Sequence, residues 1–139
     1  MLSSSLTDKF AMLEFITLPD ALPPVAPYSH AVRAGDFLFV TGQLAEDADS
    51  GEVLKLDIEA QTRQVMANLK RVLTHAGTQF ENVVMVRIFV TDFRYYEVVN
   101  QVYASYFDQA RLPSRTTVGI TALAGYGDVE IDLIVYCGT

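Results

Sequence analysis

The chain has 139 residues and a mass of 15.4 kDa, close to the commonest size of a single domain, roughly 100–150 residues. Half of the residues are hydrophobic and 19% are charged, which supports a packed core and excludes a disordered chain. Seventeen acidic residues against ten basic ones give a formal net charge of −7. This charge argues against nucleic-acid binding as the main activity.

The sequence contains no apolar run near the roughly 18 residues that a membrane span needs. The first residues also lack the clean apolar centre of a signal peptide. We therefore expect a soluble, cytoplasmic protein with no membrane partner.

Residues 1–20 show no sustained periodicity and are expected to form an N-terminal extension. Three prolines between Leu22 and Val32 exclude a helix in that segment. The apolar run Phe37–Thr41, bounded by Gly35-Asp36 and Gly42, is typical of a short strand. Residues 48–51, Ala-Asp-Ser-Gly, predict a turn.

Helical spacing of apolar residues predicts two helices. The first begins at Ile58, where Asp57 can cap it, and ends before Gly77. The second runs from about Arg94 to Ala110, because Pro113 prevents much continuation.

Three later segments alternate as strands do. Within 83–91 one predicted face is aliphatic; its members are Val84, Val86, Ile88 and Val90. From Arg115 the alternation separates Thr116, Val118 and Ile120 from Arg115, Thr117, Gly119 and Thr121. The last strand has an aliphatic face of Val129, Ile131, Leu133 and Val135. The order β-β-α-β-α-β-β predicts a two-layer α+β domain with two helices on one side of a sheet.

The second face of these strands mixes two kinds of residue. Apolar Met85, Phe89, Ile134 and Tyr136 accompany charged Arg87, Arg115, Glu130 and Asp132. Such a face is typical of contact with another protein surface, so we expect a homo-oligomer. The alternative is a solvated face with scattered apolar residues, as many monomers have.

Arg115 and Glu130 are the candidate catalytic residues. The guanidinium of Arg115 suits bidentate capture of a small carboxylate, whereas a structural ion pair with Glu130 or Asp132 is the alternative. Glu130 is predicted to lie beside Arg115 on a neighbouring antiparallel strand. It could deprotonate water and then protonate a leaving group, or it could simply form that ion pair.

Hydroxyls supply the other candidates, Tyr28, Thr41 and Thr117. Tyr28 and Thr41 each have a structural alternative, namely packing for Tyr28 and the end of a strand for Thr41. Thr117 shares a face with Arg115 through their spacing of two. The histidines, His30 and His75, do not cluster with other ligands at metal-binding spacing, so no metal is expected.

Several segments together resemble the RidA/YjgF family. They are Pro27-Tyr28, Gly35–Gln43, Gln61–Gln64 through Asn68-Leu69, Phe89–Asp92, Leu112–Val118 and Val129–Asp132. The resemblance covers roughly residues 22–137, with the motifs in the family's order, and it identifies 21–139 as a single RidA-like domain.

The resemblance implies a chorismate-mutase-like α+β subunit and a homotrimer whose sheets form a central barrel, with sites in clefts between subunits. It also implies the hydrolysis of reactive enamines and imines, such as 2-aminoacrylate, to 2-keto acids and ammonia without a cofactor or metal. By position, Arg115 matches the arginine that binds the substrate carboxylate, and Glu130 matches the acid that activates water.

Tyr28 and Thr41 match pocket residues of the family, which often has serine in place of Thr41. Thr117 departs from the family, because its best-known deaminases have cysteine at that position. This difference leaves three functions open. They are an imine deaminase, a catabolic relative acting on a 2-aminomuconate-like intermediate, and a non-catalytic ligand-binding or chaperone-like protein. A ribonuclease function, sometimes attributed to relatives, disagrees with the net charge of −7.

Overall fold

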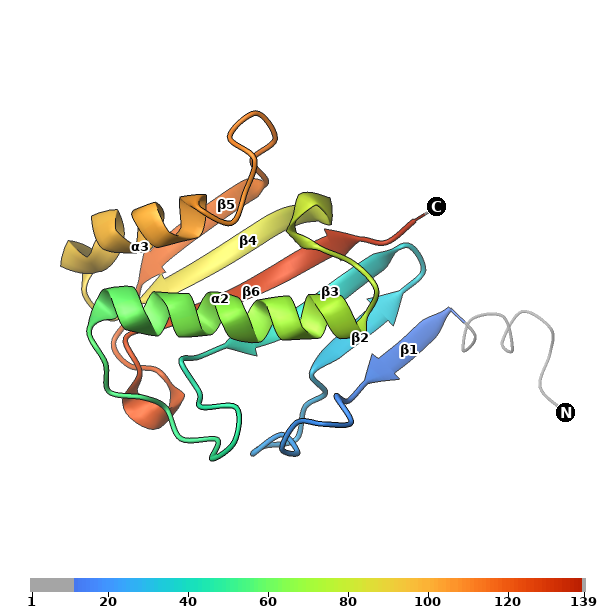
Figure 1. The fold of residues 1–139 in the computed structure, drawn as a ribbon, viewed down its shortest axis with the longest axis horizontal. Helices are drawn as coiled ribbons and strands as arrows, with labels where there is room; N and C mark the ends of the chain where they lie inside the picture. Colours follow the sequence, from blue (N-terminus) through green and yellow to red (C-terminus); the bar gives the residue numbers. More distant parts are fainter. Residues whose placement is uncertain (1–11, 139) are drawn as a thin grey trace, which may run out of the picture.

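The computed structural model describes residues 12–138, which form one six-stranded sheet with two helices on one of its faces (Figure 1). The strands are β1 (Leu13–Ile16), β2 (Ala31–Ala34), β3 (Phe37–Gln43), β4 (Val83–Val90), β5 (Ser114–Gly119) and β6 (Val129–Tyr136). Their order across the sheet is β1-β2-β3-β6-β4-β5. Only β4 and β5 are parallel neighbours; the other pairs are antiparallel.

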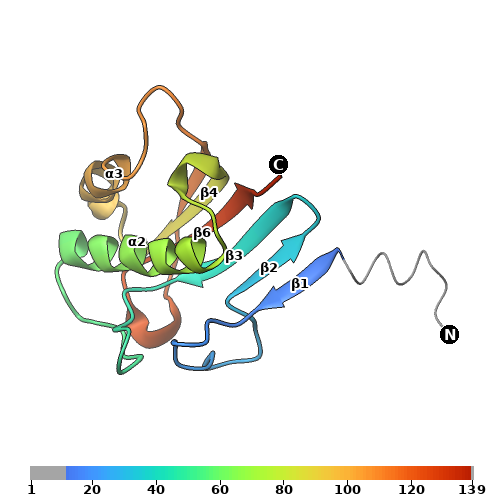
Figure 2. The same ribbon diagram turned by 45° about the vertical axis from the view of Figure 1, so that its right-hand side comes forward.

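The two helices, α2 (Ile58–His75) and α3 (Tyr96–Ala104), lie side by side on the same face of the sheet (Figures 1 and 2). The predicted limits of α2 are confirmed. The Asp57 carboxylate accepts a hydrogen bond from the Ala60 backbone N–H, and Gly77 takes the left-handed φ of +75° that follows many helices. The predicted α+β architecture with two helices on one face is therefore correct.

The core fills the space between the sheet and the helices. The sheet contributes the inward-facing positions of β3, β4 and β6, including Leu38, Val86 and Ile131, all 0% exposed. The opposing positions of α2 include Met66 and Leu69. The aliphatic face predicted for the last strand is confirmed. No helix within residues 12–138 is both long and apolar enough to cross a bilayer.

The second helix is shorter than predicted. A 3-10 turn at Phe93–Tyr95 precedes it, and the helix begins at Tyr96. It ends at Ala104 rather than near Ala110. Beyond Ala104 the backbone tightens into i→i+3 hydrogen bonds, such as Tyr106 N–H to Tyr103 O. The aromatic rings of Tyr106 and Phe107 then pack against Phe80, with centroids 5.4 Å away in both cases. Their apolar spacing reflects this aromatic cluster, not a continued helix.

Two predicted strand faces also need correction. The register between β4 and β6 shifts between Val83 and Met85, so Val83 is buried and Val84 is 41% exposed. In β5, Arg115 is opposite Val86 and Thr117 is opposite Ile88, both on the helix-covered side of β4. Arg115 and Thr117 therefore lie on the helix-covered face, and Thr116 and Val118 lie on the open face.

The N-terminal extension predicted at residues 1–20 contains β1, which pairs with β2 along its whole length. Residues 1–11 lie outside the described part of the chain. The strand was not predicted because Leu13–Ile16 is short and alternates poorly; only Ile16 is buried. It extends the sheet as an edge strand.

Gln61 is a buried polar residue that ties α2 to the loop before β6. Its side-chain N–H groups donate to Leu56 O at 2.8 Å and to an Asp128 carboxylate oxygen at 2.9 Å, while its side-chain oxygen accepts from Asp128 N–H at 3.0 Å. The residue is 1% exposed. Both N–H groups and the oxygen of its side chain are thus hydrogen-bonded, and two of these three bonds reach Asp128, 67 residues away in sequence.

We expect Gln61→Leu to lower the free energy of unfolding by about 1–3 kcal/mol, because the partly buried hydrogen bonds to Leu56 O and to the Asp128 carboxylate and N–H are lost. Denaturant unfolding at one fixed protein concentration measures the change. Gln101→Leu, on the exposed side of α3, is the control and should change stability by less than about 0.5 kcal/mol. Equal stabilities of the two variants would contradict this assignment.

Candidate functional site

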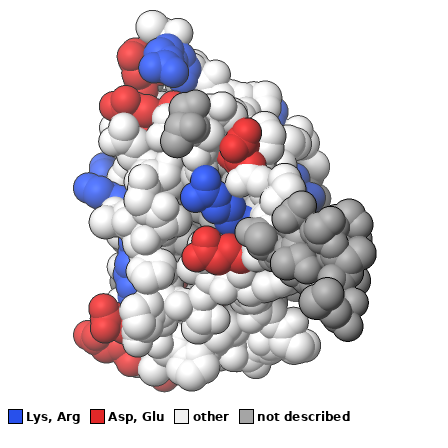
Figure 3. Space-filling view, turned by 90° about the vertical axis from the view of Figure 1, so that its right-hand side faces the viewer, with Lys and Arg blue, Asp and Glu red and all other residues white. Residues whose placement is uncertain are grey.

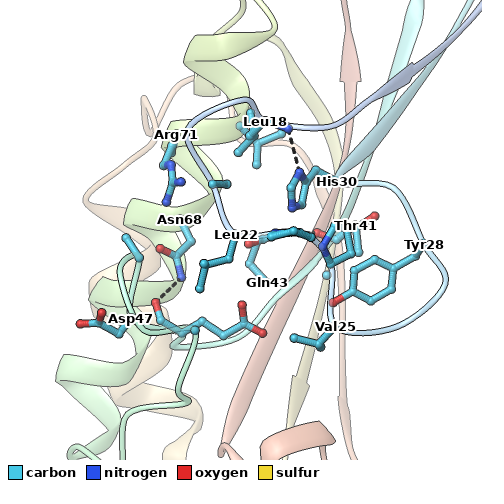
Figure 4. Close-up of a pocket in the computed structure, with 18 residues that line it drawn as sticks. Leu18, Leu22, Val25, Tyr28, His30, Thr41, Gln43, Asp47, Asn68 and Arg71 are labelled. Carbon is cyan, nitrogen blue, oxygen red and sulfur yellow. Dashed lines mark hydrogen bonds between the residues drawn. The ribbon is translucent and has the colours of Figure 1, made fainter.

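A cavity of about 80 Å³ lies between the loop that precedes β2, the end of β3 and helix α2 (Figure 4). Polar groups on its lining include Tyr28, Thr41, Gln43 and Glu46, and α2 contributes Asn68 and Arg71. Leu18, Leu22 and Val25 supply apolar walls. Such a lining suits small molecules that have both polar and apolar groups.

Hydrogen bonds fix the loop that carries Tyr28. Leu18 N–H donates to His30 Nδ1 at 2.8 Å (Figure 4), and the Thr41 hydroxyl donates to Ser29 O at 2.6 Å. Thr41 N–H also donates to His30 O at 3.1 Å. Thr41 thus lines the cavity and at the same time anchors the segment next to Tyr28.

Gly42 lets the Glu130 carboxyl group approach the backbone of β3. The register of β3 and β6 shifts between Val40 and Gln43, an irregularity that re-aims neighbouring groups. A Cβ at position 42 would lie 2.8 Å from Glu130 Cδ and 2.9 Å from Oε2. Only glycine leaves this space for the carboxyl group.

The Glu130 carboxyl group is half-buried and forms no ion pair within residues 12–138. Burial raises its pKa, the charges of Asp132 and Glu46 raise it further, and Arg87 lowers it. Arg87 is itself held by Asp132, with Nη2 to Oδ2 at 2.6 Å. Glu130 is therefore disposed to keep or take up a proton more readily than an exposed glutamate.

Arg115 projects from β5 toward α3. Its Nη2 donates to the Asn100 side-chain oxygen at 2.7 Å and to the Tyr96 hydroxyl at 3.2 Å. The rings of Tyr103 and Tyr96 flank the guanidinium, with centroids 5.0 and 5.6 Å from Cζ. All of these partners are neutral, and no carboxylate of residues 12–138 forms an ion pair with Arg115.

Two buried hydroxyls near Arg115 have no hydrogen-bond partner within the described residues, Tyr103 Oη and Thr117 Oγ1. Burial raises the pKa of Tyr103 to about 12, although Arg115 opposes the shift, so the hydroxyl stays protonated. Buried hydroxyls are normally satisfied. These two therefore mark a polar place beside Arg115 where water or a ligand could bind.

The structure does not bring the predicted site residues together in one chain. Tyr28 and Thr41 line the cavity at the β3 end of the sheet, and the Glu130 carboxyl group lies against Gly42, another lining residue. Arg115 and Thr117 lie on β5, with β4 between β5 and β6. Glu130 is opposite Phe89, on the open face of the sheet. The expected proximity of Arg115 and Glu130 is thus wrong within this chain, and so is an ion pair from Arg115 to either Glu130 or Asp132.

Sequence reasoning missed Glu46 and the residues that hold Arg115. Tyr96, Asn100 and Tyr103 are spaced i, i+4 and i+7, which places them on one side of α3. That spacing could have identified Asn100 as a polar residue on an otherwise apolar stripe. Within the described range no three His, Cys, Asp or Glu side chains are grouped as a metal site.

The family comparison matches residues 18–137 to the model described as Endoribonuclease L-PSP. A RutC family protein of Pyrococcus horikoshii is 39% identical over 125 residues, which cover 90% of this chain and 98% of that protein. A 2-iminobutanoate/2-iminopropanoate deaminase of Dermatophagoides farinae is 33% identical, covering 86% of this chain and 93% of that protein.

Solved structures show the same fold. YyfA of Yersinia pestis, described as a member of the conserved Rid protein family, superposes with a TM-score of 0.84 and 36% identity, covering 89% of this chain and 98% of that one. The comparisons and the motifs around Tyr28, Arg115 and Glu130 agree, and the chain belongs to the RidA/YjgF family, whose family model is described as Endoribonuclease L-PSP.

Proposed function

We propose that this protein hydrolyses small carboxylate-bearing enamines and imines, of the 2-aminoacrylate/2-iminopropanoate type, to 2-keto acids and ammonia. The observation that carries this proposal is the unpaired guanidinium of Arg115, half-buried among neutral partners. A charge in such a place is costly unless an anion joins it. A small carboxylate is the anion that best matches its planar, two-pronged donors.

Each predicted site residue has a role in this reaction. Arg115 binds the substrate carboxylate, and Thr117, two residues along the same face, offers a hydroxyl to substrate or water. Glu130 holds the attacking water and takes its proton. Tyr28 and Thr41 line the cavity beside Gly42, where they orient the reacting carbon.

The reaction needs little more than positioning and proton management. Water adds to the imine carbon and forms a carbinolamine, which then releases ammonia as the carbonyl forms. Because free imines already hydrolyse in water, the protein contributes by orienting the reactants and moving protons. None of these steps requires a cofactor.

Two copies are needed to complete such a site, because Arg115 and Glu130 face opposite sides of their own sheet. We propose a homotrimer whose open sheet faces pack together into a central barrel, with one site at each subunit boundary. The open face is suitably apolar. Phe37, Phe39 and Tyr136 are 41–45% exposed there, and a hollow lined by Phe39, Met85 and Ile134 lies beside them.

The surface charge favours a small-molecule substrate over nucleic acid. In the view of Figure 3, lysine and arginine side chains are interspersed with aspartate and glutamate and form no continuous basic surface. Together with the net charge of −7, this arrangement offers little to a phosphate backbone. We propose that the reaction takes place in the cytoplasm.

Replacement of Arg115 tests the carboxylate site. We expect Arg115→Ala to reduce kcat/KM by about 10–10²-fold or more, because charged hydrogen bonds to the substrate are lost. The assay couples 2-aminoacrylate release by a serine or threonine dehydratase to pyruvate formation, with semicarbazide to trap the imine. Arg63→Ala, which removes an exposed guanidinium paired with Glu59, is the matched control. Unchanged activity of Arg115→Ala would remove Arg115 from the site.

Gly42→Ala tests the placement of Glu130. The new Cβ would meet the Glu130 carboxyl group at 2.8 Å, so the flexible side chain must move while the backbone stays. We expect kcat to fall by up to about 10²-fold, the cost of a displaced reacting group, with thermal unfolding unchanged. Full activity would show that the chemistry does not depend on this position of Glu130.

A charged residue introduced on the open face of the sheet tests the proposed trimer. We expect the wild-type protein to sediment at three times 15.4 kDa and Phe39→Glu to dissociate, since a carboxylate would be buried without a partner. Analytical ultracentrifugation measures both masses. Glu59→Gln, on the exposed side of α2, should remain a trimer. A wild-type monomer would contradict the proposed assembly.

A further inference from the structure

We propose that His30 is a positioning residue of the active site, and that only its neutral form holds Tyr28 in place. The imidazole closes the base of the loop that carries Tyr28, through a hydrogen bond that protonation of the ring would break. The role of Tyr28 in catalysis rests on the proposed imine hydrolysis, whereas the closure of the loop depends only on the contacts of His30.

His30 connects the two ends of the loop of residues 17–30, which lies between β1 and β2. Its backbone N–H donates to Ile16 O at 3.0 Å, and its Nδ1 accepts a hydrogen bond from Leu18 N–H at 2.8 Å (Figure 4). A backbone N–H can only donate, so Nδ1 carries no proton and the proton of the neutral ring lies on Nε2. The side chain is thus the acceptor for a backbone group at the opposite end of the loop.

Leu18 anchors one end of this loop in the core, where its side chain is 7% exposed. A backbone N–H withdrawn from water needs an acceptor, and His30 Nδ1 supplies it. Protonation of Nδ1 would place a second donor against this N–H, and the attraction would become a repulsion. The loop can form few backbone hydrogen bonds of its own, because four of its residues have no N–H to donate, namely Pro19, Pro23, Pro24 and Pro27.

Tyr28 lies two residues before His30 and lines the same cavity (Figure 4). The backbone beside it is held to β3, because the Thr41 hydroxyl donates to Ser29 O at 2.6 Å and Thr41 N–H donates to His30 O at 3.1 Å. The segment that carries Tyr28 therefore has two attachments, to β3 through Thr41 and to Leu18 through the imidazole. Release of the second attachment leaves Tyr28 held on one side only.

The surroundings of His30 favour the neutral ring. Burial lowers the pKa of His30, the backbone of Leu22 raises it, and the charge of Arg71 lowers it further. No carboxylate of residues 12–138 forms an ion pair with His30. The titratable groups that line the same cavity are Arg71 on α2, Glu46 and Asp47 after β3, and Tyr28 in the loop.

The direction of the pKa shift sets the pH at which the closed loop is lost. An ordinary histidine titrates at about pH 6.5, and the pKa of His30 in the folded protein lies below that of the unfolded chain. The stabilisation is therefore complete above about pH 6.5 and is lost as the pH falls further, because the unfolded or opened loop binds the proton more readily. The hydrogen bond from Leu18 is intact at neutral pH and breaks in acid.

The first test observes the imidazole without any turnover. The chain has two histidines, so nitrogen-15 labelling of histidine gives two rings, and His75→Asn assigns the signals of His30. We expect Nδ1 of His30 to be unprotonated and Nε2 protonated at about pH 7.5. As the ring takes up its second proton, the protection of the Leu18 amide against hydrogen exchange should fall by about 10-fold or more.

His30→Asn is the matched variant, because Asn Oδ1 can accept from Leu18 N–H in place of Nδ1 and does not titrate. Its Leu18 protection should stay constant over the same pH range. His75→Asn, at the exposed end of α2, should behave as the wild-type protein does. A protonated Nδ1 at about pH 7.5, or Leu18 protection that does not follow the His30 titration, would overturn the proposal.

The second test measures imine hydrolysis over the pH range in which the His30 ring titrates. We expect the ratio of the wild-type kcat to that of His30→Asn to fall by about 10-fold as the ring becomes protonated, because Tyr28 is displaced, with KM little changed. The ratio cancels the pH dependence of the substrate and of Glu130, which both proteins share. His30→Leu, which has no acceptor, should be impaired at every pH.

The outcomes separate this inference from the proposed function. If the wild-type protein is active and the ratio of the two kcat values does not change with pH, His30 does not position Tyr28 and the proposed function stands. If the wild-type protein is inactive while the Leu18 protection still follows the His30 titration, the proposed function fails and the closure of the loop by the neutral ring stands.

Discussion

The alternation of side chains across a β-sheet separates Arg115 and Glu130, two half-buried charged groups that form no ion pair within residues 12–138. Arg115 is opposite Val86 and points toward α3, whereas Glu130 is opposite Phe89 and points to the open face. A shift of one residue in either strand would move its whole apolar set to the wrong face. The hydrophobic core therefore holds the guanidinium and the carboxyl group apart within one subunit.

This separation explains why the sheet leaves an apolar face open. A chain that buried both faces against its own helices would have no surface to share, and Glu130 would be enclosed without a partner. Phe39 and Tyr136 remain over 40% exposed on the open face, where they suit contact with a second copy. Core packing and the proposed assembly thus follow from the same strand pattern.

Most of the fold could be predicted from the sequence because α2, β4 and β6 repeat their patterns over many residues. Asp57 and Gly77 mark the ends of α2 by local chemistry alone. The errors fall where tertiary contacts override the local pattern. The aromatic cluster at Phe80 ends α3 early, and a register shift exposes Val84. The helix-covered face of β5 was predicted wrongly because both faces of this strand carry threonine. Periodicity alone therefore could not show which face the helices cover.

The sequence indicated candidate site residues but not how they are arranged. Motifs pointed to Arg115 and Glu130 as candidates, whereas their separation follows from the sheet order, in which β4 lies between β5 and β6. Glu46 was not identified because it follows β3 in a loop with no periodicity. Its backbone oxygen accepts a hydrogen bond from the Asn68 side chain of α2, a contact that the local sequence does not indicate.

The charge of the Arg115 region and the charge of the Glu130 region complement each other. Arg115 lies among neutral aromatic and amide groups, the Glu130 carboxyl group lies beside Gly42, and neither forms an ion pair within residues 12–138. If the second copy brings these regions together, a bound carboxylate substrate balances Arg115 instead of Glu130. Glu130 then stays free to exchange protons, because an ion pair with arginine would hold it ionised. In the proposed site, the bound substrate carboxylate thus prevents Arg115 and Glu130 from forming an ion pair with each other.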